Sequence, residues 1–263
     1  LCSEKGGREV VDSTLFMEIE KWHFPLHFVD FETSMVAIPF NKGRRPYEQI
    51  AFQFSCHTLH EDGQIEHAEW IQKQPGQFPN FDFLIALKEI LERDEGTILR
   101  YTHYENSVLR KIHNQLQKAV NGEYEMVPPD PDNLLTWIDS ITEWDEKVIV
   151  KGKSRKVRRR GSRNMADMFE LVKRFYYHPM MGGSNSMKVV LPAVVSASEF
   201  LKEKYSNPYS GTNYKSMIWW HPEEATGRPV DPYSLLPPIF EDVDISKDEL
   251  FLDNEHIQEG GAA

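Results

Sequence analysis

The sequence predicts an α/β protein in which helices flank a mixed sheet of antiparallel hairpin strands and parallel strands. Three observations support this fold class. The apolar run 26–31 is typical of a central strand. The runs 50–57 and 65–71 alternate apolar and polar residues around a turn at 60–63, which predicts a hairpin. A helical pattern then precedes a strand at 97–101, and such a crossover returns the chain parallel to the first strand and beside it.

The helices follow from apolar residues at helical spacing and from flanking proline and glycine. Ser13 is a favourable N-cap for the first helix, which ends before Pro25, and Gly96 follows the second helix. In chain order we expect helices at 13–22, 80–94, 105–117, 134–144, 165–175 and 191–205. The basic run 151–163 has no periodicity and is expected to form an exposed loop.

Composition limits the classes of protein. The chain of 263 residues has 40% hydrophobic and 27% charged residues, as in ordinary globular proteins. Its two cysteines form neither a disulfide framework nor a four-cysteine zinc site, and we expect a cytoplasmic protein. No apolar run approaches the roughly 20 residues of a membrane helix, so no membrane partner is expected. The net charge of −11 argues against a generally basic surface, although local basic patches remain compatible with nucleic acid.

Asp30 and Glu32 are set two residues apart into the first apolar strand. Strand side chains alternate, so both carboxylates face the same way, roughly 6–7 Å apart. Two buried acids need positive charge, and divalent metal ions bind carboxylate oxygens. The alternative is an edge strand whose acids lie in water or pair with lysine and arginine.

Glu105 stands where the strand 97–101 ends and the next helix begins. An acid at a helix start is favoured by the helix dipole, by about 0.3–1 kcal/mol, and that effect alone accounts for it. Ligands of open sheets gather outside the carboxyl ends of strands, however. A crossover strand beside the first strand brings Glu105 toward Asp30 and Glu32.

Three blocks of sequence carry a resemblance to a known family. They are Val29-Asp30-Phe31-Glu32-Thr33, then Tyr104-Glu105-x-x-x-Leu109, then Asp167-Met168-x-x-Leu171-Val172 with His178-Pro179 and the run Gly183 to Pro192. In this order the chain resembles the ribonuclease H-like 3'–5' exonucleases of the DEDD (DnaQ-like) group. It is most similar to an uncharacterised bacterial domain family of that superfamily, often found behind a RecB-like nuclease module.

The resemblance implies hydrolysis of phosphodiester bonds with two Mg²⁺ or Mn²⁺ ions about 3.5–4 Å apart. Asp30 and Glu32 match the metal-binding acids of the first motif, and Glu105 stands where the second motif usually has aspartate. Asp167 is a candidate catalytic residue and extra ligand, or a structural residue at a helix start. The family's fourth acid, five residues after a histidine or four after a tyrosine on a late helix, is missing here. We expect it beyond Ala263.

The resemblance also sets the expected organisation: a lead-in helix at 1–23, a ribonuclease H-like nuclease domain at 24–206, and an irregular acidic segment at 207–263 that stops before the last motif helix. The expected partners are single-stranded ends of nucleic acid and, in the full-length chain, a RecB-like module. Two rival functions stay open. One is an inactive nucleic-acid-binding module that serves a partner nuclease, and the other is a protein-interaction domain using the acidic C-terminal third.

Two groups of residues are candidates for binding phosphates. Ser186 and Lys188 precede a helix, where backbone N–H groups attract anions, although a serine there also serves as a simple N-cap. Arg158, Arg159 and Arg160 belong to the basic run, the concentrated positive stretch of an acidic chain. They would contact the nucleic-acid backbone and set the salt dependence of binding, or else form a solvated loop.

Overall fold

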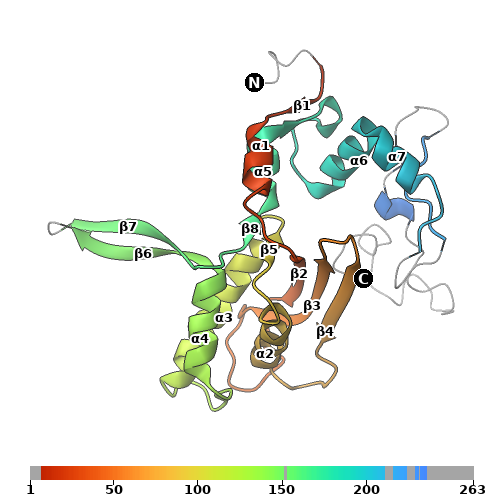
Figure 1. Ribbon diagram of the computed structural model, residues 1–263. Coiled ribbons are helices and arrows are strands. Elements are labelled where there is room, and N and C mark those ends of the chain that lie inside the picture. Colours follow the sequence, from red (N-terminus) through yellow and green to blue (C-terminus); the bar gives the residue numbers. More distant parts are fainter. Residues whose placement is uncertain (1–6, 151–152, 211–215, 224–228, 231, 236–263) are drawn as a thin grey trace, which may run out of the picture. The chain divides into compact units, whose positions relative to one another are not determined.

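The computed structural model describes residues 7–150, 153–210, 216–223, 229–230 and 232–235 (Figure 1). The chain falls into two compact units. One is Thr14–Leu171, and the other consists of the described residues of 1–13 and 172–263. The first unit contains the sheet and the acids singled out above. The expected domain boundaries after residues 23 and 206 stay a prediction.

A five-stranded mixed sheet forms the centre of the first unit. Its strands are β2 (Leu26–Ser34), β3 (Ile50–Leu59), β4 (Ile65–Ile71), β5 (Thr97–Arg100) and β8 (Ala166–Asp167). Their order is β4-β3-β2-β5-β8; β2, β3 and β4 are antiparallel neighbours, whereas β5 is parallel to both β2 and β8. The predicted hairpin and the parallel pairing of the first strand with the crossover strand are both confirmed.

Helices cover one face of this sheet. They are α2 (Asn80–Leu91), α3 (Tyr104–Val120) and α4 (Pro131–Ile141), and the short α1 (Thr14–Ile19) precedes the sheet in the chain. Phe83 of α2 contacts Phe31 and Phe54 edge to face, at ring-centroid distances of 5.0 and 5.4 Å. Leucines and isoleucines of α2, α3 and α4 complete the same buried cluster. Burial of each side chain of this size contributes about 1.5–3 kcal/mol to the free energy of folding. The packed core therefore holds β2 and β5 in place.

The prediction of a loop at 151–163 is wrong, because most of these residues belong to a β-hairpin. The strands β6 (Glu143–Val150) and β7 (Lys153–Arg160) pair antiparallel, and Figure 1 shows them projecting away from the rest of the unit. The helix expected at 134–144 ends earlier, at Ile141, for the same reason. The basic strand has no apolar alternation because neither of its faces enters the core. The two strands are instead stabilised by pairs of opposite charges across the hairpin.

Gly161 follows the hairpin in the chain and packs against the backbone at the C-terminal end of α4. The Gly161 N–H donates to the carbonyl oxygen of Thr142 at 2.9 Å. A Cβ atom at this position would lie 2.1 Å from the carbonyl oxygens of both Asp139 and Ser140. Since these are backbone atoms, the close approach requires glycine.

We therefore expect Gly161→Ala to lower the free energy of unfolding by about 1–3 kcal/mol, the usual effect of overpacking. Urea denaturation would measure this change. Ser162→Ala, at the exposed next position, is the control and is expected to change stability by less than about 0.5 kcal/mol. Equal stability of the two variants would contradict the close approach.

The second unit is smaller and mostly helical. Its elements are β1 (Val10–Val11), β9 (Tyr176–Tyr177), the 3₁₀ helices η1 (Pro179–Met181) and η2 (Pro232–Leu235), α6 (Met187–Ala197) and α7 (Glu199–Tyr205). The helix expected at 191–205 is thus divided at Ser198, whose hydroxyl accepts from the N–H of Leu201 and starts α7. The helix α5 (Met168–Phe175) links the units in sequence.

Beyond residue 207 the described stretches contain η2 and two isolated β-bridges, and the remainder of the segment expected to be irregular lies outside the described residues. Within the described part of the chain, no helix is long and apolar enough to cross a membrane.

Candidate active site

Asp30 and Glu32 lie on the face of β2 that points away from the buried helices. Val29 and Phe31, which alternate with them, are buried in the core, whereas Asp30 is exposed and Glu32 half-buried. The neighbouring strand places Ser55 opposite Asp30 and Gln53 opposite Glu32, so it offers no cation. Within the described residues neither acid forms an ion pair. The alternative of pairing with lysine or arginine therefore does not apply there.

The two carboxyl groups hold their protons more tightly than free side chains do. Partial burial raises the pKa of Asp30, against a hydrogen bond of 3.1 Å from the N–H of Phe31. Partial burial and the negative charge of Asp30 raise the pKa of Glu32 to about 7. Burial and like charge both disfavour the ionised form, so the pair stores electrostatic repulsion that a cation would relieve.

Glu105 enters the same electrostatic neighbourhood from the first turn of α3. Its side chain is only 4% exposed, and its Oε2 atom has no hydrogen-bond partner among the described residues. Burial raises the pKa of Glu105 to about 7, with contributions from the charges of Asp30 and Asp167 and against that of Arg100. The charge of Asp30 therefore acts on the Glu105 carboxyl group. A buried carboxylate oxygen without a partner is rare, and it calls for an explanation.

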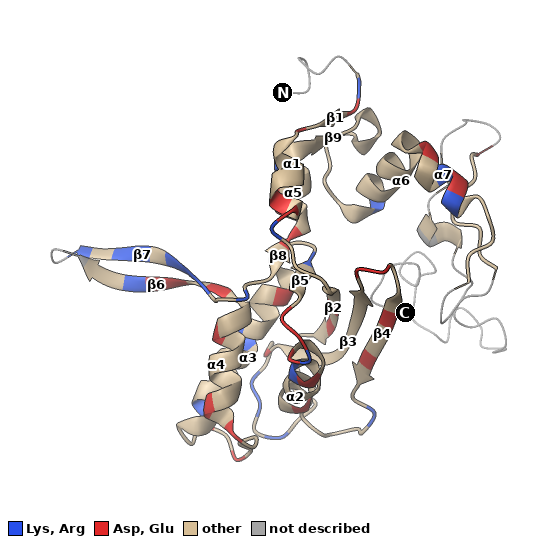
Figure 2. Cartoon of the chain, viewed as in Figure 1, with Lys and Arg blue, Asp and Glu red and all other residues tan. Residues whose placement is uncertain are grey.

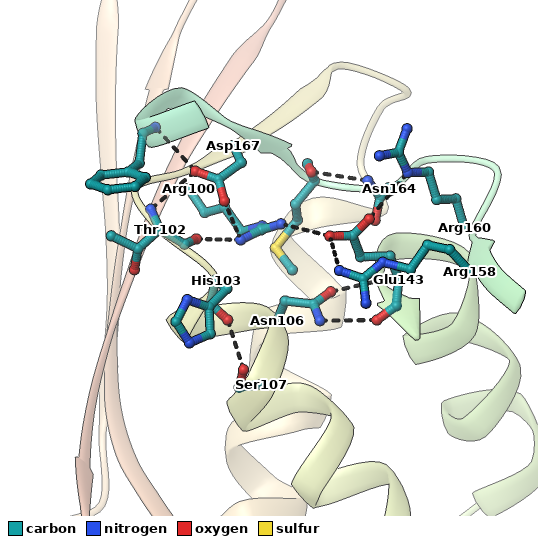
Figure 3. Close-up of polar contacts among 12 residues, drawn as sticks. Arg100, Thr102, His103, Asn106, Ser107, Glu143, Arg158, Arg160, Asn164 and Asp167 are labelled. Carbon is teal, nitrogen blue, oxygen red and sulfur yellow. Dashed lines mark hydrogen bonds and ion pairs between the residues drawn. The ribbon is translucent and has the colours of Figure 1, made fainter. Parts of the chain in front are cut away.

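Arg100 and Asp167 hold the turn that positions Glu105 (Figure 3). The guanidinium of Arg100 is 2% exposed and donates from Nη1 to Asp167 at 2.8 Å and to the carbonyl oxygen of Thr102. Asp167 also accepts from the N–H groups of Thr102 at 3.1 Å and Phe169 at 3.0 Å. Thr102 adopts a φ of +78°, which non-glycine residues rarely do. These bonds fix the strained turn directly before α3.

The carboxylate of Asp167 is therefore already engaged by three donors, one of which starts α5. In this arrangement Asp167 holds the turn before α3, and its oxygens are less available to a metal ion than Oε2 of Glu105, which has no partner among the described residues. A second link joins the end of β2 to α3, where the hydroxyls of Thr33 and Tyr104 share a hydrogen bond.

Glu143, at the start of β6, extends this network toward the hairpin. It contacts Arg100 at 3.4 Å, and its carboxylate also pairs with Arg158 at 3.2 Å and Arg160 at 3.1 Å (Figure 3). Asn106 of α3 exchanges two hydrogen bonds with the Glu143 backbone, at 2.8 and 3.0 Å. The network joins the turn before Glu105 to the base of the hairpin.

Arg100, Thr102 and Glu143 were missed by sequence reasoning. The one available signal was an arginine that ends an apolar strand just before Glu105, because a buried arginine requires carboxylate partners.

The predicted phosphate-binding residues lie in different places. Arg158 and Arg160 pair with Glu143, and Arg159 pairs with Glu146 at 2.6 Å, all at the base of the hairpin. Ser186 and Lys188 belong to the other unit, at the N-terminus of α6. The Ser186 side chain makes no capping hydrogen bond there.

Asp30, Glu32 and Glu105 offer carboxylate oxygens, which are the type of ligand that a hard divalent cation prefers. Glu105 contributes an unpartnered buried oxygen. In the described ranges, however, no three acids, histidines or cysteines converge closely enough to hold a metal ion. The side chains therefore share an electrostatic neighbourhood without forming a closed coordination shell.

Comparison with known protein families identifies a match over much of the chain. The family described as a domain of unknown function (DUF2779) matches residues 27–186, a segment that contains Asp30, Glu32, Glu105 and Asp167. No curated protein and no solved structure matches the chain. The matched segment is more than half of the 263 residues, and the chain therefore belongs to the DUF2779 family.

Proposed function

We propose that this protein is a metal-dependent nuclease that hydrolyses phosphodiester bonds of nucleic acid, with a ribonuclease H-like fold and a 3'–5' exonuclease-like mode of action on single-stranded ends. The observation that carries the proposal is the buried Oε2 of Glu105, which has no hydrogen-bond partner among the described residues, in a carboxyl group whose pKa the charge of Asp30 helps to raise. Acids with raised pKa values, gathered where parallel strands end, are typical of functional sites. The sheet order β4-β3-β2-β5-β8, in which the β3–β4 hairpin lies on one side of β2 and the parallel strands β5 and β8 on the other, is compatible with that fold.

In this proposal, Asp30, Glu32 and Glu105 would hold Mg²⁺ or Mn²⁺, and the bound metal would supply Lewis-acid chemistry for the attacking water and the leaving oxygen. A bound cation would relieve the charge repulsion among the three carboxylates, and its uptake would displace the protons that their raised pKa values retain. Arg100 and Asp167 would hold the turn before the first turn of α3, where Glu105 lies. A fourth acid, and a RecB-like partner module, belong to the proposal as predictions.

One observation favours an alternative, namely a ribonuclease H-like module that binds nucleic acid without cleaving it. The described residues contain no closed group of three metal ligands. If the carboxylates do not take up a metal ion, the same fold would serve only to position nucleic acid for another nuclease. The two functions differ in their response to metal.

Thermal unfolding with and without Mn²⁺ tests the proposal. At a free concentration of about ten times Kd, a ligand specific for the folded state adds about 1.4 kcal/mol of stability. For a domain of this size that corresponds to a rise of about 3–6 °C in Tm. Asp30→Asn is expected to abolish the rise, while Glu61→Gln, on the exposed turn after β3, retains it.

The same proteins are then assayed for Mn²⁺-dependent release of nucleotides from a labelled single-stranded oligonucleotide. A wild-type Tm that does not respond to Mn²⁺ or Mg²⁺ would exclude the nuclease proposal and favour the binding module. An equal response in Asp30→Asn would place the metal elsewhere in the protein.

A further inference from the structure

The hairpin β6–β7 has two halves of different charge. In the base half, three acids of β6 face three arginines of β7. Arg158 pairs with Asp145 at 3.0 Å and with Glu143, Arg159 pairs with Glu146, and Arg160 pairs with Glu143. Because this half neutralises itself, the arginines first expected to bind nucleic acid are already engaged by carboxylates.

The distal half, residues 147–150 and 153–157, carries four cations and no acid. The cations are Lys147, Lys153, Arg155 and Lys156, all exposed and without an ion pair within the described ranges. Lys147 lies directly opposite Lys156 in the strand register. Like charges in that relation are destabilising. Figure 2 shows basic residues along the distal half of this projecting hairpin, whereas both basic and acidic residues occur along the other elements of the unit. A polyanion bound at the end of the hairpin would relieve the repulsion.

The cations lie on both faces of the ribbon. Residues that oppose each other in an antiparallel pair share a face, and successive residues alternate. Lys147 and Lys156 therefore occupy one face, and Lys153 and Arg155 occupy the other. The distal half contains no aromatic residue, and among its described side chains the exposed apolar one is Ile149, which is 81% exposed.

We propose that the distal half of this hairpin enters a groove of double-stranded nucleic acid, so that the substrate of the protein contains a duplex beside its single-stranded end. A two-stranded ribbon fits the major groove of B-form DNA, which is about 12 Å wide and is bounded by phosphates on both sides. Cations on both faces match those two phosphate walls. A single strand would instead follow one charged face and stack on aromatic side chains, which are missing here. This inference rests on the proposal that the protein acts on nucleic acid.

Binding in EDTA tests the inference separately from catalysis, because no metal is needed to hold the hairpin in a groove. The probes are a fluorescent 20-base-pair DNA duplex and the corresponding single strand, each titrated at several salt concentrations. In the test variant all four distal cations become glutamine: Lys147→Gln, Lys153→Gln, Arg155→Gln and Lys156→Gln. In the control variant four exposed cations outside the hairpin become glutamine: Lys42→Gln, Lys73→Gln, Arg93→Gln and Lys204→Gln.

The test variant is expected to bind the duplex at least about tenfold more weakly and to lower the slope of log Kobs against log salt by about 3–4, since each phosphate contact adds about 0.9. The control variant should keep most of the duplex affinity and most of the salt slope. Three results would each overturn the inference. The first is an equal loss of duplex affinity in the test and control variants, and the second is a preference of the wild-type protein for the single strand. The third is duplex binding that polyglutamate does not weaken although polyglutamate is bound to the hairpin. Because metal is absent throughout, an inactive site leaves these outcomes unchanged.

Discussion

Arg100→Leu is expected to lower the free energy of unfolding by about 3–5 kcal/mol, because it leaves the carboxylates of Asp167 and Glu143 without their buried cation. The guanidinium is 2% exposed and lies 2.8 Å from Asp167 and 3.4 Å from Glu143. It also donates to the carbonyl oxygen of Thr102, in the turn that positions Glu105. Urea denaturation of the complete chain would measure the loss.

Two further variants separate charge from packing. Arg100→Leu combined with Asp167→Asn should recover part of the lost stability, since the uncompensated charge is then removed. Arg159→Gln breaks an exposed ion pair with Glu146 and is expected to change stability by less than about 1 kcal/mol. If the double variant were no more stable than Arg100→Leu alone, the effect would come from lost packing.

Glu105→Gln is expected to stabilise the metal-free protein by about 2–3 kcal/mol at pH 8 and to change little at pH 4. The pKa of Glu105 is raised from 4.5 to about 7 in the folded state. The folded protein therefore binds more protons than the unfolded chain between these values. Its stability falls as pH rises from about 4.5 to 7. Glutamine carries no charge, so the variant escapes this loss.

Denaturation in EDTA across pH 4 to 8 would measure the difference between wild type and variant. Glu89→Gln, on the exposed side of α2, is the control and should shift stability by less than about 0.5 kcal/mol at every pH. In Mn²⁺ the advantage of Glu105→Gln should shrink or reverse, because only the carboxylate binds the ion. An advantage that does not depend on pH would show that the Glu105 carboxyl is not held in a desolvated, negative environment.

The elements of the first unit followed from local pattern. The strand around Asp30, the hairpin after it and the crossover to the strand at 97–101 were all predicted from alternation, turn residues and helical spacing. The adjacency of β2 and β5 required only the geometric rule for parallel strands. These inferences succeed because a residue that enters the core must repeat with the period of its own helix or strand.

The charged hairpin escaped the same reasoning. Arg158, Arg159 and Arg160 face solvent and acids rather than the core, so their strand has no apolar repeat. The helix predicted at 134–144 includes the first two residues of the partner strand, because Glu143 and Trp144 alone do not distinguish a helix from a strand. The pairing becomes visible only when the register of β6 with β7 is known.

By itself the sequence determined the fold class, the hairpin and crossover, and the placement of Asp30 and Glu32 on one face of a strand. Only the tertiary structure decided that Arg100 and Asp167, 67 positions apart, lock the turn before Glu105. It also decided that an oxygen of Glu105 is buried without a partner among the described residues, and that the hairpin's described cations without an ion pair lie in its distal half. The physical reason is that periodicity reports the environment of each residue along its own element. The partner of a buried charge depends instead on which distant segments the fold brings into contact.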